Sequence, residues 1–341
     1  RPLRMRIPGH ERPACANKNS SASNASIFNM SINSVDQGGD QGYLRLAGET
    51  DVQGGGANVF SSPQTKCCGT ELYVDILTLA AVSGMSFMLT VACHEHLGHS
   101  LACFALGGTV TELGAFYVNC QYMSELNQKI TQIAGPFVNV ILGILCARLL
   151  DCVVKKSTWN KAVVFFLWHF FTVNLLNAGG YLMFSGVVGI GDLGTDKNGV
   201  GYDVEPEWLY RTLLVLFGLF AYLVAVFASL KKFDLFVGGD QSERVRRAQW
   251  ISFISYISGG LVATATGCFN PEGMKMVLKS TVPSSFGGPA AMLSMMRCLN
   301  KEKITGLPPF KMERSWPLIA GCSACVLAYA IVFGRTLVLK S

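Results

Sequence analysis

Long apolar runs separated by short polar segments make up the chain from residue 72 onwards. A helix rises about 1.5 Å per residue, so about 20 apolar residues cross a hydrocarbon core that is about 30 Å thick. Runs of roughly this length or longer are 72–106, 130–154, 159–184, 207–230, 251–269 and 317–337. This pattern predicts an all-α polytopic membrane protein with about six transmembrane helices.

Two segments depart from the helical pattern. Residues 109–122 follow Gly107-Gly108 and are rich in Thr, Val, Tyr and Phe, which predicts a short β-hairpin after the first helix. Residues 280–299 are apolar enough to cross or re-enter a membrane, although proline and glycine interrupt a regular span. A seventh or re-entrant segment is therefore the alternative to a count of six.

The first 70 residues contrast with the rest of the chain. They are rich in Ser, Asn, Gly and Gln and show no sustained helical or strand period, which predicts a disordered polar tail. Asn19, Asn24 and Asn29 each begin an Asn-x-Ser sequon, which matters only if this tail is lumenal. The expected organisation is a tail over 1–70 and a polytopic membrane domain over 71–341.

Composition and charge support the membrane class. Only 15% of the residues are charged and 50% are hydrophobic, whereas a soluble domain carries about a quarter charged residues. The net charge of +6 is spread among loops, which fits an anionic lipid surface and not a nucleic-acid partner. Lys and Arg gather in the loops after the second and fourth spans, so we expect this side, and the tail, to be cytosolic.

The twelve cysteines do not suggest a disulfide framework. Half of them lie in apolar runs, where we interpret them as small buried hydrophobic residues: Cys93, Cys103, Cys146, Cys268, Cys322 and Cys325. The last two have the spacing of half a zinc finger, but no second pair accompanies them.

The segment 94–99, inside the first apolar run, reads His-Glu-His-Leu-Gly-His. Ionisable groups at membrane depth are costly and mark functional sites. The segment is close to His-Glu-x-x-His, in which two histidines one helical turn apart bind zinc and the glutamate acts as a base. One extra residue separates His94 from His99, and residues five apart differ by about 140° around a regular helix.

Two geometries can reconcile this insertion with a metal site. A π-bulge, which adds one residue to a helical turn, would bring His94 and His99 onto one face and leave Glu95 as the base. A regular helix would instead pair His99 with Glu95 or with His96. We favour the bulge because Gly98 lowers the cost of distorting the helix, and we keep His96 as an alternative ligand.

Three segments resemble site-2-type intramembrane zinc metalloproteases. HEHLGHSLACFALGG resembles the metal-binding helix of that family, and IAGPFVNVILGIL carries its Gly-Pro-x-x-Asn pattern at Gly135, Pro136 and Asn139. NLLNAGGYLMFSGVVGIGDLG is similar to the later segment in which Asn-Leu-Leu precedes an aspartate ligand, although no Leu-Asp-Gly follows here. The resemblance covers about 73–195, and an inserted His-Glu-x-x-x-His also occurs in the soluble dipeptidyl peptidase III family.

The resemblance implies a third zinc ligand after the third span, and Asp192 is the expected residue. Glu112 is an alternative ligand and Glu125 a further rival. Asn174 and Asn177 are expected to bind substrate, or else to join helices by hydrogen bonds. The metal-binding core would then be about 72–195, followed by C-terminal helices over 207–341.

The expected function is a zinc-dependent intramembrane endopeptidase that cleaves transmembrane or membrane-proximal segments of other membrane proteins. The alternative is a non-catalytic protein on the same scaffold, either a substrate-binding pseudoprotease or a metal-ion carrier. A carrier would place ionisable residues in several spans. Apart from the first and third, the predicted spans offer few, which favours the enzyme.

Overall fold

The computed structural model describes residues 66–67, 70–121, 124–155, 159–237, 243–299 and 310–339. All of them belong to one compact unit, Val59–Ser341. The predicted tail and its three sequons lie outside the described residues, apart from the last few positions of the tail.

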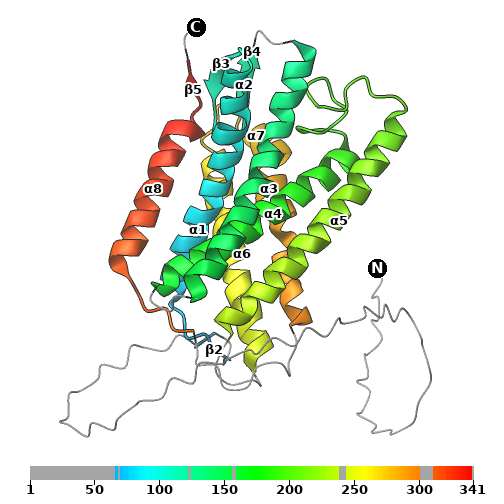
Figure 1. The fold of residues 1–341 in the computed structure, drawn as a ribbon. Helices are drawn as coiled ribbons and strands as arrows, with labels where there is room; N and C mark the ends of the chain where they lie inside the picture. Colours follow the sequence, from blue (N-terminus) through cyan, green and yellow to red (C-terminus); the bar gives the residue numbers. More distant parts are fainter. Residues whose placement is uncertain are drawn as a thin grey trace, which may run out of the picture. The chain divides into compact units, whose positions relative to one another are not determined.

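Five helices are long and apolar enough to cross a membrane, judged by length and composition. They are Ile76–Ala105, made of α1 (Ile76–Ala92), a π-helix (Cys93–Ser100) and α2 (Leu101–Ala105); α3 (Glu125–Lys155); α4 (Lys161–Val188); α5 (Glu207–Phe233) with a 3₁₀ turn (Asp234–Phe236); and α8 (Trp316–Gly334). Figure 1 shows them together with α6. The mostly helical membrane-type fold predicted from the sequence is present.

A sixth helix, α6 (Arg244–Gly267), covers most of the predicted span 251–269 and packs along α1. It is not among the five helices of sufficient apolarity. Its first turn carries Arg244, Arg246 and Arg247, and Ser, Thr and Gly are frequent along it. The count of six spans therefore stays a prediction.

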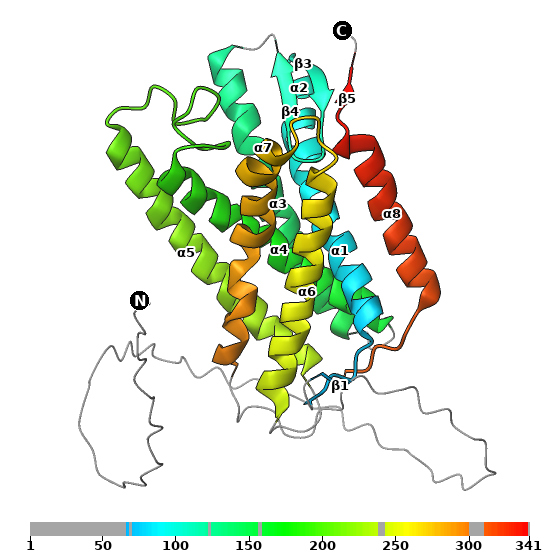
Figure 2. The ribbon, with the colours of Figure 1, turned by 180° about the vertical axis from the view of Figure 1, so that it is seen from behind.

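The segment after α6 runs the length of the helical bundle as a series of short pieces (Figure 2). These are α7 (Met274–Met276), π-helices over Val277–Thr281 and Pro283–Gly287, and 3₁₀ helices over Gly288–Leu293 and Met295–Cys298. Near its start, Ser280 donates a hydrogen bond of 3.3 Å to the Phe116 carbonyl. Proline and glycine explain why this segment is apolar yet irregular.

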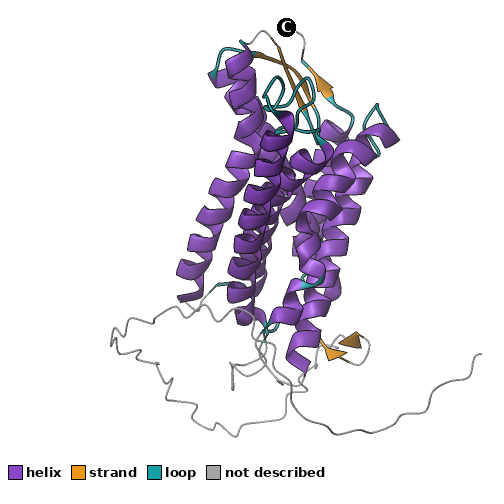
Figure 3. Cartoon of the chain, turned by 90° about the vertical axis from the view of Figure 1, so that its right-hand side faces the viewer, coloured by secondary structure: helices purple, strands orange, loops and turns teal. Residues whose placement is uncertain are grey.

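A small antiparallel sheet lies at the end of the bundle that α2 reaches, which we call the sheet end (Figures 1 and 3). β3 (Thr109–Leu113) and β4 (Val118–Gln121) form the predicted hairpin, which is confirmed. β5 (Leu337–Val338) pairs with the other side of β3, so the strand order is β4-β3-β5 and β4 is an edge strand. A second pair joins β1 (Lys66–Cys67) to β2 (Thr70–Glu71).

A disulfide joins Cys103 in α2 to Cys120 in β4, with Cα atoms 6.1 Å apart. Cys103 is buried, as expected, but it is bonded to Cys120, which the sequence did not indicate. Periodicity along one helix could not reveal a partner that lies in a strand. The disulfide ties the hairpin to the helix that carries the histidines. The expectation that the opposite end, with Lys155 and Lys232, is cytosolic stays a prediction.

Helix α4 lies at the centre of the bundle. In its most apolar stretch 83% of the residues are buried, against 22% for α3 and 11% for α8. Trp168 and Phe171 are fully buried in the core around it. The outer helices instead expose large apolar side chains such as Phe220 and Leu145, as membrane-facing helices do. Because α4 is surrounded by protein, it can hold polar side chains in the interior of the bundle, next to the site.

Candidate metal centre

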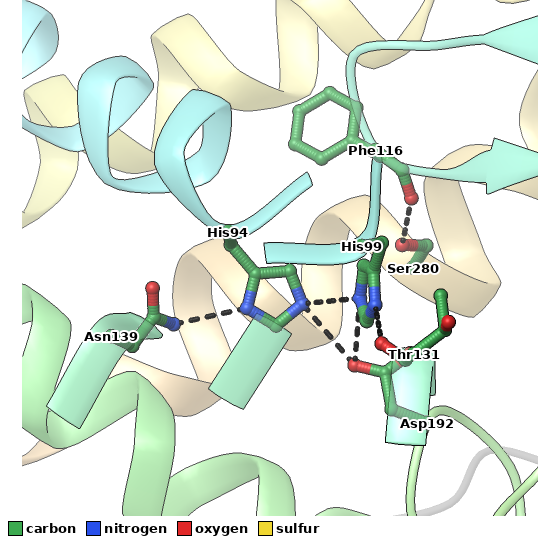
Figure 4. Close-up of polar contacts among 7 residues, drawn as sticks. All are labelled: His94, His99, Phe116, Thr131, Asn139, Asp192 and Ser280. Carbon is green, nitrogen blue, oxygen red and sulfur yellow. Dashed lines mark hydrogen bonds and ion pairs between the residues drawn. The ribbon is translucent and has the colours of Figure 1, made fainter. Parts of the chain in front are cut away.

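The helix carrying the histidines changes from α to π at Cys93 and returns to α after Ser100. At its end the Leu101 N–H points to the His96 carbonyl, five residues back, as in a π-helix. The predicted bulge is therefore confirmed. It absorbs the inserted residue and places the Nε2 atoms of His94 and His99 3.2 Å apart (Figure 4).

Asp192 completes the cluster from the loop after α4. Gly189 ends the helix with φ of +80° and Gly191 follows with φ of +92°, so two residues in the left-handed region reverse the chain just before the aspartate. The Asp192 Oδ2 atom lies 3.2 Å from His94 Nε2 and 3.4 Å from His99 Nε2. These three side chains form a group that can hold a metal ion.

The spacing of the three atoms fits a tetrahedral zinc site. Their separations of 3.2, 3.2 and 3.4 Å make a nearly equilateral triangle. Ligands about 2.0–2.1 Å from zinc in a tetrahedron are about 3.3 Å from one another. Two imidazoles and one carboxylate are also a donor set of catalytic zinc sites, which leave a fourth position open.

The Nδ1 atom of each imidazole contacts a group outside the triangle, and these contacts determine whether the Nε2 atom has a lone pair available for a metal ion. His99 Nδ1 lies 2.8 Å from the Thr131 carbonyl, which only accepts, so Nδ1 carries the proton and neutral Nε2 presents a lone pair. His94 Nδ1 lies 3.1 Å from the Asn139 amide. Rotating this amide by 180° would let Oδ1, which has no partner among the described residues, accept from Nδ1.

Helix α3 approaches the histidines closely because glycine faces them. A Cβ at Gly135 would lie 2.5 Å from His99 Nε2 and 2.8 Å from His94 Cε1. A Cβ at Gly98 would in turn meet the Gly135 backbone at 2.5 Å. The glycine pair thus lets the helix backbones touch at the metal centre, while Pro136 follows inside α3.

Asp192 is held in its ionised form. Burial raises the pKa of its carboxyl, but the adjacent imidazoles of His99 and His94, when they are protonated, outweigh burial and hold that pKa below its ordinary value. An ionised carboxylate is the state that binds a metal ion.

A cavity of about 310 Å³ opens beside the triangle. It is lined by Glu95, His99 and Asp192, by hairpin residues 116–120, and by Lys279 and Ser284 of the irregular segment. Glu95 is 4% exposed and its carboxylate is not one of the three converging ligand atoms. A carboxylate of this kind can take up a proton next to the open metal position.

The alternative ligands lie elsewhere. His96 faces α8, where its Nε2 lies 3.3 Å from the Tyr329 hydroxyl and its ring packs on Phe333. Glu112, on β3, accepts a hydrogen bond from Tyr117, and Glu125 pairs with Lys129 at the start of α3. None of these three joins the cluster found among the described residues.

The two asparagines of α4 have different places. Asn174 donates to Thr90 at 3.0 Å and to the Phe170 carbonyl at 2.7 Å, so it joins α4 to α1. Asn177 lines a small cleft with His94, Glu95 and Tyr181. Its Oδ1 has no partner among the described residues. The structure thus leaves Asn177 beside the site and gives Asn174 an interhelical role.

Sequence reasoning missed Tyr181, whose ring stacks on His94 with centroids 4.9 Å apart and planes 24° apart. Its spacing of four from Asn177 was a signal, because such residues share a helix face. The sequence also pointed to an irregular segment over 280–299, but not to its place at the site, where it adds Ser284 to both cavities.

Two imidazoles, two carboxylates and a cavity thus meet between apolar helices. Such an arrangement of side chains supports a chemical role for the site even when no related protein is identified. Comparison with protein-family models, with curated proteins and with solved structures finds no match for this chain.

Proposed function

We propose that this chain is a zinc-dependent intramembrane endopeptidase that cleaves membrane segments of other membrane proteins. The observation that carries this proposal is the convergence of three ligand atoms next to Glu95 at a cavity among apolar helices. Two neutral imidazole nitrogens and one carboxylate oxygen are all acceptors, and a cation at their centre satisfies all three.

The donor set favours zinc over harder cations. Magnesium and calcium prefer sites made only of oxygen ligands, whereas imidazole suits zinc. A zinc ion bound there supplies a Lewis acid that activates water and polarises a peptide carbonyl. The chain itself supplies the base: Glu95 accepts the proton of the attacking water and returns it to the leaving amine.

The hairpin gives a place for an extended substrate. β4 is an edge strand, and residues 118–120 line the cavity together with Glu95. An edge strand presents unpaired N–H and C=O groups that can bind an added strand. We infer that a locally unwound transmembrane segment pairs with β4, which would bring its peptide bonds to the metal centre.

A metal-ion carrier is the alternative, and the structure supports it less well. Transport requires successive binding positions along a path. In the part of the chain that the structure describes, only His94, His99 and Asp192 form a group of three residues able to hold a metal ion. The buried His169 on α4 contacts Ser86 at 2.9 Å and belongs to no such group among the described residues.

The proposal is tested with purified protein in lipid vesicles. The reporter is a single-span peptide with a Gly-Pro centre between a fluorophore and a quencher, because glycine and proline favour local unwinding. We expect cleavage within the span, loss of cleavage after incubation with a zinc chelator, and recovery on adding zinc. Absence of cleavage from zinc-loaded protein, across reporters with varied sequences around the centre, would contradict the proposal.

A further inference from the structure

We propose that Tyr181 is a catalytic residue, whose hydroxyl donates a hydrogen bond to the scissile carbonyl oxygen as negative charge develops on it. This inference rests on the proposed peptidase function and adds a residue to it. Three observations carry it: the stacking of Tyr181 on a metal ligand, the uncommitted state of its hydroxyl, and the fixed backbone that presents it.

The ring of Tyr181 is in contact with the metal centre. It stacks on His94, and the residue lines both the large cavity and the smaller cleft next to it. Glu95 lines the same two spaces. Tyr181 and Glu95 therefore both border the space that a peptide group must enter to react.

The hydroxyl of Tyr181 is available. None of the described residues forms a hydrogen bond with it, although it lies within electrostatic reach of Asp192 and Glu95. The other tyrosines near the site are committed: Tyr117 donates to Glu112, and Tyr210 donates to the Leu193 carbonyl. A half-buried phenol usually has a partner, and one without a partner at a cavity wall is placed to donate to a ligand.

Close packing fixes the backbone that carries Tyr181. A Cβ at the preceding Gly180 would lie 2.9 Å from Gly288 Cα, so α4 touches the irregular segment there without a side chain between them. One turn earlier, Asn177 is held at 3% exposure. A donor that is already in position does not have to reorganise when charge appears, which is the condition for effective stabilisation.

The chemical step balances without ionisation of Tyr181. Water oxygen forms a bond to the carbonyl carbon while Glu95 takes one water proton, and the C=O π electrons move to the carbonyl oxygen. That oxygen accepts the Tyr181 hydrogen bond, and the phenol keeps its proton. The electrons return to re-form C=O as the C–N bond breaks, and the proton on Glu95 goes to the amine.

The test compares Tyr181→Phe with the wild type on the vesicle reporter. Loss of one such donor should lower kcat about a hundredfold while KM changes little. Metal content should be unchanged, because phenylalanine keeps the stack on His94. Tyr256→Phe is the matched control, since its hydroxyl bonds to the Phe286 carbonyl outside the cavity and its loss should leave kcat near the wild-type value.

A binding measurement separates this role from the cleavage assay. A phosphinic peptide mimics the tetrahedral arrangement, and Tyr181→Phe should weaken its binding about a hundredfold while binding a matched plain peptide as the wild type does. Equal phosphinic-peptide affinity in both proteins, or loss of metal from the variant, would overturn the catalytic role. If zinc-loaded wild type binds this peptide but cleaves no reporter, the peptidase proposal and the catalytic role fail together, while the affinity ratio still shows whether Tyr181 donates a hydrogen bond to the bound oxygen. A zinc-loaded wild type that neither binds this peptide nor cleaves a reporter overturns both proposals, and one that cleaves reporters but does not bind the peptide overturns the role of Tyr181.

Discussion

Replacing Glu95 by glutamine should stop cleavage of the reporter and leave the metal bound. Glutamine has nearly the same shape as glutamate but cannot accept the proton of the attacking water, and loss of a general base costs about 10²–10⁴ in rate. The metal should stay because its three expected ligand atoms come from His94, His99 and Asp192. The measurements are kcat on the vesicle reporter and metal content of the same preparation.

The matched control for this variant is Glu125→Gln. Glu125 is exposed at the start of α3, where it pairs with Lys129. Surface pairs of this kind contribute little to stability, so this control should keep full activity. Wild-type cleavage by Glu95→Gln would rule out Glu95 as the base. Loss of metal from Glu95→Gln would show that Glu95 is itself a metal ligand and would contradict the proposed ligand set.

Replacing Gly135 by alanine should have the largest effect on metal binding of any change outside the ligands. The new methyl carbon would lie 2.5 Å from His99 Nε2, which is the atom that should bind the metal. The ring cannot easily move aside, since its Nδ1 is bonded to the Thr131 carbonyl at 2.8 Å. Disturbing the groups that orient a metal ligand costs about 10–100-fold in affinity, and a direct clash should cost at least that.

Gly321→Ala in α8 is the matched control for this substitution. A Cβ there meets no atom within 4 Å, so it should leave metal affinity unchanged. Zinc affinity is measured by competition with a chelating dye, and a melting curve in detergent checks that each variant is folded. Wild-type zinc affinity in Gly135→Ala would contradict the close approach of α3 to the histidines.

The π-bulge and the two histidine ligands could be predicted because one short segment, 94–99, contains the residues that determine them. Histidines in an apolar run mark a functional site. His94 and His99 can share one helix face only if the helix bulges between them. Gly98 in the bulge was a local signal as well. The third ligand was different: Asp192 is 93 residues beyond His99 by sequence number, and only the family resemblance singled it out.

The rest depends on contacts between distant segments, which periodicity does not encode. The disulfide joins a helix to a strand, and Ser280 reaches the hairpin through a hydrogen bond to Phe116. The sequence analysis also did not predict that α4 lies at the centre of the bundle. The one signal was its mean hydropathy of 1.5, which is below the 2.6 of the span containing α5. A helix surrounded by protein can be less apolar than one that faces lipid.

Metal content of detergent-purified protein tests the central claim, that His94, His99 and Asp192 together bind zinc. The comparison uses His99→Ala, Asp192→Ala and His96→Ala, because His96 lies in the same π-helix but faces Tyr329 on α8. The wild type and His96→Ala should each carry about one zinc per chain, and the other two variants should lose it. Zinc retained at the wild-type level in both His99→Ala and Asp192→Ala, or lost only from His96→Ala, would contradict the account.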